Sequence, residues 1–285
     1  MYTGKTKNLG VIGYPIKHSL SPVIQNAAIA AAGLDYAYIA MPIAPEDLKT
    51  AVSGLKAANF SGFNVTIPHK VTIMQYLDEI DPVAEFIGAV NTVKIENGRL
   101  YGYNTDVIGF INPLLKEGFE LKGKTVVIFG AGGASRAIIC GLIQQKVAHI
   151  ILGVRNKVKG EKLAASFKDL ISIEAYDWRD EEFTAWLAKA DLLVNTTPLG
   201  MFPNIDGVVP LEWEKVKNDA FVYDIVYTPA KTRFLREAEE HGHKILNGEK
   251  MLAEQGGASL QYWTGKEADV EVMVKALRKY LEQSK

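Results

Sequence analysis

The chain has 285 residues, long enough for one large domain or for two domains with their own cores. Its hydrophobic content of 48% and charged content of 23% are typical of a soluble globular protein. The net charge of −1 gives no global electrostatic reason to expect nucleic acid or an anionic membrane as a partner.

The cysteine, apolar and histidine residues further limit the class of protein that this sequence can encode. The single cysteine, Cys140, excludes an internal disulfide, and its place in an apolar segment predicts a buried structural residue. No signal-peptide region is found, nor any apolar run of the roughly 18 residues that span a bilayer, so we expect a cytoplasmic protein. The five histidines have no spacing with acidic residues or cysteine that suggests a metal site, so no metal is expected.

Strand-like and helix-like segments alternate along the chain, which predicts the α/β class. Ahead of residue 80 we predict strands over residues 8–13, 36–41 and 62–67, and helices over residues 22–32, 45–58 and 71–77. Ser21 and Pro22 at the first helix fit an N-cap followed by proline at the first helical position. The two hydroxyls of Ser19 and Ser21 would also suit a polyol or a carboxylate, so both interpretations stay open.

The third strand runs into Asn64-Val-Thr-Ile-Pro-His-Lys70, which gathers polar side chains where a strand ends. Pro68 suits the transition into a helix and would place Lys70 in or near its first turn. There the helix macrodipole disfavours an ammonium, which would make Lys70 a candidate for acid–base catalysis. A single lysine is more often a solvated surface charge; the company of Asn64 and Thr66 at a strand's carboxyl end favours a ligand site.

A β-hairpin is predicted next. Residues 90–95 and 99–103 alternate in polarity around Asn97-Gly98, a strong signal for a two-residue hairpin turn. If those two residues form the loop, Asn91 lies opposite Asn104. The segments Asn91-Thr92 and Asn104-Thr105-Asp106 then meet at one end of the ribbon.

A glycine-rich turn stands between a predicted strand and a predicted helix in Val126-Val-Ile-Phe-Gly130-Ala-Gly-Gly-Ala-Ser135-Arg-Ala-Ile-Ile. Such a turn lets the backbone approach a pyrophosphate, and free N–H groups at the helix start face its charge. Ser135 stands where the third glycine of the usual fingerprint falls, and a tight structural turn is the competing interpretation.

The second strand of this unit, His149 to Val154, indicates which dinucleotide would bind. An acidic residue that holds a ribose 2′-hydroxyl is expected after this strand in NAD-binding proteins, and none stands there. Arg155, with Lys157 and Lys159 close behind, would instead meet a 2′-phosphate. NADP is therefore favoured over NAD; the alternative is a solvated basic loop.

The rest of the chain completes the α/β pattern. A helix is predicted over residues 107–117, and strands recur near residues 125, 150, 173, 192 and 221. The stretch from Met251 to Leu281 predicts two helices separated by Gly265. Because they have no strand to alternate with, we expect these helices to pack back onto the first domain.

At this point the chain resembles the shikimate dehydrogenase family, on eight motifs that occur in order across nearly the whole sequence. They are His18-Ser-Leu-Ser-Pro22, Asn64-Val-Thr-Ile-Pro-His-Lys70, Gly88-Ala-Val-Asn-Thr92, Asn104-Thr-Asp106, Gly130-Ala-Gly-Gly-Ala-Ser-Arg136, Asn195-Thr-Thr-Pro-Leu-Gly-Met201, Asp224-Ile-Val-Tyr227, and Gly248 through Met251-Leu252 to Gln255.

The resemblance implies NADP-dependent, reversible reduction of 3-dehydroshikimate to shikimate, in chorismate and aromatic amino-acid biosynthesis. It implies that Lys70 and Asp106 form the catalytic pair at the reacting oxygen of the substrate. The implied substrate-binding residues are Ser19, Ser21, Asn64, Thr66, Asn91, Tyr227 and Gln255. The implied cofactor-binding residues are Gly130, Ala131, Gly132, Gly133, Ala134, Ser135, Arg136, Arg155, Lys159, Thr196, Ile225, Gly248 and Met251.

We accordingly expect an α/β protein of two domains with a cleft between them. Residues 1–106 with 250–285 would form an α/β substrate-binding domain, and residues 107–249 a Rossmann-like NADP-binding domain. The expected partner is a small molecule, not nucleic acid or membrane, and homodimer formation is left open.

Two departures from the family pattern leave the specificity open. Val154-Arg155-Asn156 stands where the family commonly has Asn-Arg-Thr, which leaves open how strictly NADP is preferred. Gln25-Asn26 replaces the His-Asn of many members, and related quinate/shikimate dehydrogenases also carry glutamine there. The alternatives are therefore a quinate/shikimate dehydrogenase with relaxed cofactor use and, in a different class, a nucleotide-sensing module without catalysis.

Overall fold

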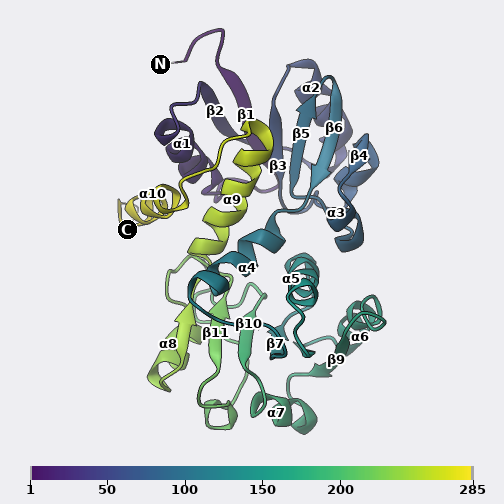
Figure 1. Ribbon diagram of the computed structural model, residues 1–285, viewed down its shortest axis with the longest axis vertical. Coiled ribbons are helices and arrows are strands. Elements are labelled where there is room, and N and C mark those ends of the chain that lie inside the picture. Colours follow the sequence, from purple (N-terminus) through teal and green to yellow (C-terminus); the bar gives the residue numbers. More distant parts are fainter. Residues whose placement is uncertain (1, 284–285) are drawn as a thin grey trace. The chain divides into compact units, whose positions relative to one another are not determined.

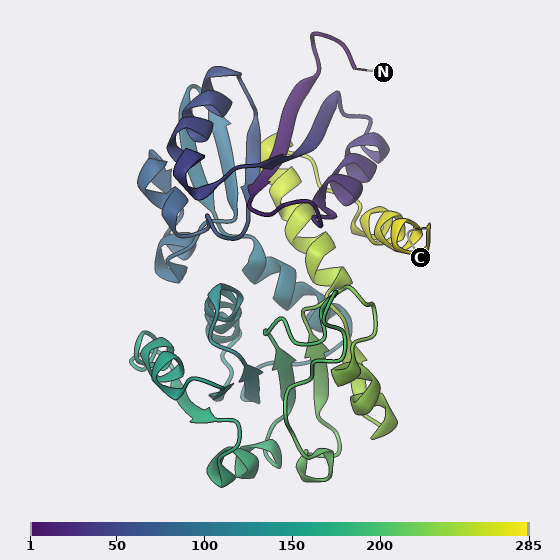
Figure 2. The same cartoon turned by 180° about the vertical axis from the view of Figure 1, so that it is seen from behind.

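The computed structural model describes residues 2–283, which form two compact units. One unit comprises the described residues up to 109 and from 252 to 283, and the other comprises Phe110–Met251. Each unit is built around its own six-stranded sheet. Figure 1 and the reverse view in Figure 2 show the strands of each unit with helices around them. The α/β class predicted from the sequence is confirmed.

The first unit contains a mixed sheet with the strand order β2-β1-β3-β5-β6-β4. Its strands are β1 (Lys7–Gly13), β2 (Tyr36–Pro42), β3 (Gly62–Val65), β4 (Glu79–Ile80), β5 (Thr92–Glu96) and β6 (Arg99–Tyr103). Its helices are α1 (Ser21–Ala31), α2 (Leu48–Ala57), α3 (Pro82–Ile87) and α10 (Val270–Gln283), with short 3₁₀ helices over Pro45–Asp47 and Thr72–Tyr76. The two helices α4 (Asp106–Lys116) and α9 (Glu249–Thr264) contain the unit boundaries.

Two apolar clusters cover the two faces of this sheet, because successive strand residues point to opposite sides. Val11 and Tyr38 pack on one face with Ile24 of α1, Leu260 of α9 and Met273 of α10. The other face packs against α2 and the 3₁₀ helix Thr72–Tyr76. The C-terminal helices thus pack onto the first sheet, as the sequence predicts.

Strands β5 and β6 form the predicted hairpin with the predicted register. Antiparallel pairs run from Glu96 opposite Arg99 next to the turn to Thr92 opposite Tyr103 at the far end. Asn97 and Gly98 both have positive φ angles, of 50° and 71°, as a two-residue type I′ turn requires.

The second unit contains an all-parallel sheet with the strand order β12-β11-β10-β7-β8-β9. Its strands are β7 (Thr125–Phe129), β8 (His149–Val154), β9 (Ser172–Asp177), β10 (Leu192–Asn195), β11 (Phe221–Asp224) and β12 (Lys244–Leu246). Its remaining helices are α5 (Gly133–Gln144), α6 (Lys157–Ala165), α7 (Glu181–Leu187), α8 (Arg233–Glu240) and a 3₁₀ helix over Trp213–Lys215.

This strand order is the doubly wound arrangement of dinucleotide-binding folds, which bind ligands where the order reverses. Here the reversal falls between β7 and β10, whose last paired residues are Phe129 and Asn195. Helices α5 and α6 pack on one face of the sheet, and α7 and α8 pack on the other. Cys140 is buried in α5, and burial raises the pKa of its thiol.

Two details differ from the sequence-based predictions. Strands β4 and β12 and helix α3 are additional elements. Helix α1 starts at Ser21, and Leu20 occupies the cap position without a side-chain cap bond, so the N-cap interpretation of Ser21 is wrong. Within residues 2–283, no helix has the length and apolar character needed to cross a membrane.

Candidate active site

Lys70 and Asp106 are paired in the first unit. The Lys70 Nζ lies 2.6 Å from the Asp106 Oδ2, and the two side chains are 26% and 10% exposed. Lys70 lies in a turn two residues before the 3₁₀ helix Thr72–Tyr76, which places it near the start of a short helix, as expected, although not within an α-helical turn. The neighbouring carboxylate, rather than a helix dipole, therefore dominates the surroundings of the ammonium.

The second carboxylate oxygen of Asp106 is also occupied. Asn91 Nδ2 donates to Asp106 Oδ1 at 2.7 Å, and Asn104 Oδ1 accepts from the backbone N–H of Asp106 at 3.0 Å. Both asparagines come from the ends of the β5–β6 hairpin. The hairpin register therefore brings the carboxylate to the lysine and fixes its rotation.

Asn91 belongs to a buried cluster of hydroxyls. Its Oδ1 accepts from the backbone N–H of Thr105 at 2.8 Å and from the hydroxyl of Thr92 at 2.9 Å. Thr92 Oγ1 in turn lies 2.8 Å from the Oγ of Ser259 on α9. Thr92, Thr105 and Ser259 are all fully buried, so water does not compete for these bonds.

Asn64 is the next member of this cluster. Its Oδ1 accepts from the hydroxyl of Tyr38 at 2.7 Å, and its Nδ2 lies near three acceptors, on Asn91, Thr92 and Ser259, at 2.9–3.1 Å. An amide nitrogen has two protons and its oxygen two lone pairs. Within the described residues, the one position of Asn64 left for a ligand is therefore the second lone pair of Oδ1.

Tyr38 extends the cluster to the loop that follows β1. Burial raises the pKa of Tyr38 well above its ordinary value, while a hydrogen bond with the Ser21 side chain opposes the shift. Ser19 Oγ accepts from the backbone N–H of Ser21 at 3.4 Å. Both serines are half-buried, as is Thr66 at the end of β3, so their hydroxyls remain within reach of a ligand.

On helix α9, Gln255 is half-buried, and its Nε2 donates to the Leu252 carbonyl at 2.8 Å. Ser259 lies one turn further along the same helix and donates to the Gln255 carbonyl at 2.9 Å. Seven of the predicted substrate and catalytic residues are thus gathered with Gln255 in the first unit, and Tyr227 lies in the second.

Two members of the cluster, Tyr38 and Ser259, were not predicted from the sequence, whereas the hairpin register predicts that Thr105 lies beside Asn91. Ser259 had a usable signal, because residues four apart on a helix share a face and Ser259 follows Gln255 by four. Tyr38 had none, since a tyrosine in an apolar strand is ordinarily part of the core.

Gln25 and Asn26 both have structural partners. Gln25 is fully buried and donates to the Gly256 carbonyl at 2.8 Å, joining α1 to α9 beside Gln255. Asn26 bonds both backbone groups of Tyr38, accepting from its N–H at 3.0 Å and donating to its carbonyl at 2.8 Å. Because β2 is an edge strand, Asn26 occupies backbone groups that would otherwise be open to pairing.

In the second unit, the glycine-rich turn connects β7 to α5. Gly130 has a φ of 113°, and a Cβ there would lie 2.7 Å from Thr196 Oγ1, so a side chain is excluded. Gly132 and Gly133 are exposed, and a Cβ on either would meet nothing within 4 Å. The backbone at the start of α5 therefore faces open space, which fits the approach of a pyrophosphate.

The remaining residues of this turn take different positions. Ser135 is fully buried; its Oγ accepts from the Gly132 N–H at 3.1 Å and lies 2.8 Å from Thr196 Oγ1. Ala131 and Ala134 are half-buried, and the guanidinium of Arg136 lies 5.5 Å from the centre of the Phe167 ring. The Ser135 hydroxyl thus fixes the turn from inside.

The basic segment after β8 is exposed. Lys157 lies 3.7 Å from Asp180 and above the ring of Tyr176, so its charge is partly engaged. Arg155 and Lys159 have no ion pair among the described residues and follow the carboxyl end of β8. Their positions fit the binding of an anionic group such as a 2′-phosphate.

Ile225, Gly248 and Met251 lie together beyond β11 and β12. A Cβ on Gly248 would overlap the carbonyl oxygen of Ile225, and the Gly248 N–H donates to the Val226 carbonyl at 3.0 Å. Met251 is 9% exposed and belongs to the apolar cluster against which Ile225 packs. Tyr227 follows on the same loop, and burial raises the pKa of its hydroxyl.

Asp224 is a buried carboxylic acid at the end of β11. It accepts from Asn195 Nδ2 at 3.0 Å, the Val226 N–H at 3.0 Å and the Thr232 hydroxyl at 2.6 Å. Burial nevertheless dominates and raises the pKa of Asp224 to about 6. The acid ties together the loops that carry Thr196 and Tyr227.

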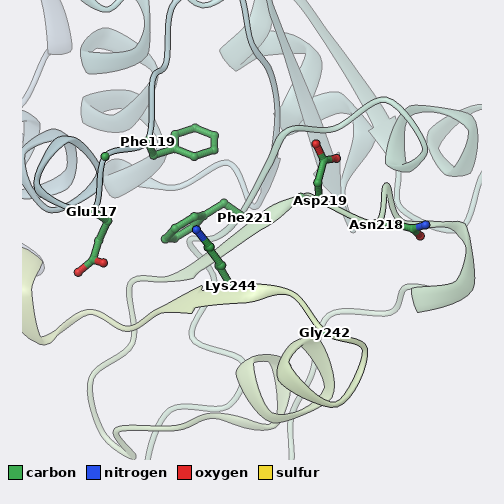
Figure 3. A pocket seen from close by; sticks show the side chains of 9 residues that line it. Glu117, Phe119, Asn218, Asp219, Phe221, Gly242 and Lys244 are labelled. Carbon is green, nitrogen blue, oxygen red and sulfur yellow. The ribbon is translucent and has the colours of Figure 1, made fainter.

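A surface pocket of about 320 Å³ lies elsewhere in the second unit. Figure 3 shows Phe119, Phe221 and Lys244 among the side chains that line it. Phe221 and Lys244 are the first residues of β11 and β12, whereas ligands of doubly wound sheets bind at the carboxyl ends of the strands. This pocket is therefore not the candidate site.

A mixed sheet with a lysine–aspartate pair and a parallel sheet with a glycine-rich turn at its reversal point are features of nicotinamide-dependent dehydrogenases. Two family models match the chain: the shikimate dehydrogenase substrate binding domain over residues 11–93, and the shikimate 5′-dehydrogenase C-terminal domain over residues 248–278. A shikimate dehydrogenase (NADP(+)) of Methanocaldococcus jannaschii is 43% identical over 97% of this chain and 98% of its own. The chain belongs to the shikimate dehydrogenase family.

Solved structures agree with this assignment. A shikimate dehydrogenase in complex with NADP+ superposes with a TM-score of 0.91, at 42% identity, over 98% of this chain and 97% of that one. A shikimate 5-dehydrogenase from Thermus thermophilus in complex with NADP(H) and shikimate gives 0.87, at 35% identity, over 96% and 99%. A quinate dehydrogenase from Corynebacterium glutamicum in complex with NAD gives 0.89, at 29% identity, over 96% and 99%.

Proposed function

We propose that this protein catalyses the reversible, NADP-dependent reduction of 3-dehydroshikimate to shikimate, a step of chorismate and aromatic amino-acid biosynthesis. The observation that carries the proposal is the contact between Lys70 and Asp106, with Asn91 on the second carboxylate oxygen. Membership of the shikimate dehydrogenase family supports it.

The chemistry assigned to this pair follows from its hydrogen bonds. An ammonium has three donors, and Asp106 uses one, so Lys70 can donate to the substrate oxygen. In the reductive direction Lys70 gives its proton to the carbonyl oxygen as that oxygen becomes a hydroxyl. Asp106 holds the lysine in place, and in the reverse direction the lysine takes the proton back.

Substrate binding is assigned to polar residues around this pair. Ser19, Ser21 and Thr66 are half-buried hydroxyls suited to a carboxylate or a ring hydroxyl, and Asn64 offers one acceptor position. Asn91 and Gln255 complete the set in the first unit, and Tyr227 is assigned to the same role from the second.

The cofactor is assigned to the second unit. The backbone from Gly130 to Ala134, which is exposed at Gly132 and Gly133, would hold the pyrophosphate with the start of α5, and Ser135 and Thr196 would fix the turn. Arg155 and Lys159 would hold the 2′-phosphate, and Arg136 would border it. When bound, NADPH supplies the hydride. The half-buried and buried residues Ile225, Gly248 and Met251 would exclude water beside the nicotinamide.

The test is the absorbance of the reduced nicotinamide with shikimate or quinate, each paired with NADP or NAD. Turnover with shikimate and NADP that is at least tenfold above every other combination is the expected result. Absence of turnover in all four combinations would refute the enzymatic proposal and favour a nucleotide-sensing module.

A quinate/shikimate dehydrogenase with relaxed cofactor use is the second candidate. The similarity to the quinate dehydrogenase and the glutamine at position 25 favour it. Gln25 bonds the backbone beside Gln255, so it could alter substrate breadth through the position of helix α9. Comparable rates on shikimate and quinate would establish this candidate.

The proposal has three further parts. Residues 1–106 with 250–285 form the substrate-binding domain, and residues 107–249 form the NADP-binding domain. The enzyme acts in the cytoplasm on small molecules, and homodimer formation is left open. Cell fractionation and light scattering of the purified protein would test the last two points.

A further inference from the structure

Ser259 has an unusual number of polar neighbours for a fully buried serine on a helix. Its Oγ accepts from Asn64 Nδ2 at 2.9 Å, lies 2.8 Å from Thr92 Oγ1 and donates to the Gln255 carbonyl at 2.9 Å. A fourth contact, with Thr105 Oγ1, measures 3.3 Å. A buried serine on a helix can satisfy its own hydroxyl with one hydrogen bond to the backbone carbonyl four residues earlier, and it needs no further polar neighbour.

These neighbours belong to two series of hydrogen-bonded side chains that extend to the proposed substrate-binding and catalytic residues. Asn64 leads to Tyr38 and Ser21, and Thr92 leads through the Asn91 side chain to Asp106. Ser259 is the residue at which both series meet helix α9, which also carries Gln255.

Counting protons shows that the arrangement depends on Ser259. A hydroxyl has one proton and two lone pairs. When Thr92 donates to Asn91, a second proton must lie between Thr92 and Ser259, or their oxygens repel each other at 2.8 Å. Ser259 has a single proton, which bonds either the Gln255 carbonyl or Thr92 Oγ1, and in both arrangements its oxygen accepts a proton of Asn64.

We propose that Ser259 is a positioning residue of this enzyme: its hydroxyl sets the orientation of Asn64 and, through Thr92 and Asn91, of the Lys70–Asp106 pair. This inference rests on the proposed function, because it assigns Ser259 to the same reaction. Among the residues that the structure describes, Ser259 has no hydrogen bond with Lys70 or with the cofactor-binding residues, so we expect its removal to leave cofactor binding intact.

The first test is Ser259→Ala, which removes one oxygen atom and leaves the helix propensity favourable. Asn64 and Thr92 then lose a buried partner that water cannot replace. We expect kcat/KM for shikimate to fall about tenfold, equivalent to ~1.4 kcal/mol, while the Kd for NADPH stays within twofold. A purely structural serine would lower the melting temperature without this selective kinetic loss.

Thr264→Ala is the matched control. Thr264 lies on the same helix and donates to the carbonyl four residues earlier, on Leu260, at 2.8 Å. It has no contact with the cluster among the described residues, so this variant should lose stability and keep kcat/KM. An equal kinetic loss in both variants would overturn the proposal, because helix damage would then explain it.

A double-mutant cycle with Thr92→Val tests the coupling itself. Valine keeps the shape of threonine but removes the hydroxyl that faces Ser259. If the two hydroxyls act together, the double variant Ser259→Ala/Thr92→Val should have nearly the same kcat/KM as the less active of the two single variants. Additive losses, or Ser259→Ala within twofold of wild type, would refute the role of Ser259. An inactive wild-type protein would refute the proposed function instead.

Discussion

Asn91 holds Asp106 from the side opposite Lys70: its Nδ2 lies 2.7 Å from Oδ1, while the lysine lies 2.6 Å from Oδ2. The carboxylate therefore accepts from a neutral donor and a charged donor at once. Two consequences follow, that Asp106 cannot rotate and that the lysine is held at one point relative to the hairpin. The arrangement is stabilised before any substrate arrives, as electrostatic preorganisation requires.

Replacement of Lys70 tests the catalytic assignment. Lys70→Ala should lower kcat by roughly 10²–10⁴-fold, since positioned acid–base catalysis contributes about that much. The Kd for NADPH should stay nearly unchanged. Both quantities follow from steady-state rates and cofactor fluorescence.

Lys94→Ala is the matched control for that variant. Lys94 is similarly exposed, at 25%, and its Nζ lies 2.7 Å from Glu96 Oε1 on the hairpin. It should keep wild-type turnover. If Lys70→Ala also retains full turnover, Lys70 is not the catalytic acid.

Replacement of Arg155 tests cofactor selectivity. Arg155→Ala should weaken NADP by about 10-fold to 100-fold through the loss of a charge-assisted contact, and should leave NAD within twofold. Arg179→Ala is the control, because Arg179 lies at the end of the next strand and already makes paired bonds to Asp177 at 2.7 and 2.8 Å. Equal losses for NADP and NAD would contradict the 2′-phosphate assignment.

Gly248 should tolerate no side chain. Gly248→Ala places a methyl group on the backbone of Ile225, so we expect a loss of about 1–3 kcal/mol in the free energy of unfolding. Gly54→Ala, exposed in α2 with open space around it, should instead stabilise the protein by about 0.5–1 kcal/mol. Denaturant titrations measure both, and a stable Gly248→Ala variant would show that the two loops are not in close contact.

Asp224 predicts a pH dependence of stability. Its pKa is about 6 in the folded protein and 3.8 as the ordinary value, so the folded state binds the proton more tightly. The tighter binding of the proton in the folded state adds to the free energy of unfolding. This contribution, about 3 kcal/mol, is complete below pH 3.8 and is lost as the pH rises through 6.

Asp224→Asn should remove that pH dependence while keeping the side-chain shape. The difference in unfolding free energy between wild type and this variant, measured from pH 4 to pH 7, should change in favour of the variant as the pH rises. A constant difference would mean that Asp224 does not titrate in this window.

The elements that depend on local chemistry could be predicted from the sequence. The Asn97-Gly98 turn determines the hairpin register, and that register by itself predicts that Asn91 lies beside Asp106. The glycines at 130, 132 and 133, framed by a strand and a helix, predicted the turn at the sheet's reversal point. In both turns the local structure depends on a few residues with special backbone conformations, and asparagine and glycine at those positions indicate these conformations directly.

The sequence predicts that the C-terminal helices pack on the first domain, but it does not predict the individual contacts of that packing. Ser259 meets Asn64 and Thr92 only because α9 packs on the first sheet, and its rotation there depends on apolar partners such as Leu260. Around Lys70 the sequence predicts a short helix close to the lysine, but it does not predict that this helix is of the 3₁₀ type and starts at Thr72. Such contacts reflect the sum of many weak preferences over distant segments.

The two-residue turn at Asn97-Gly98 has a consequence for how this protein can vary. Side chains alternate between the faces of a strand, so adding or removing one residue there would reverse the face of every residue on one strand of the hairpin. Asn91 and Asp106 would part, although neither had changed. Surface loops elsewhere tolerate changes of length more readily, whereas the length of this exposed turn is tied to the Lys70–Asp106 pair at the hairpin's far end.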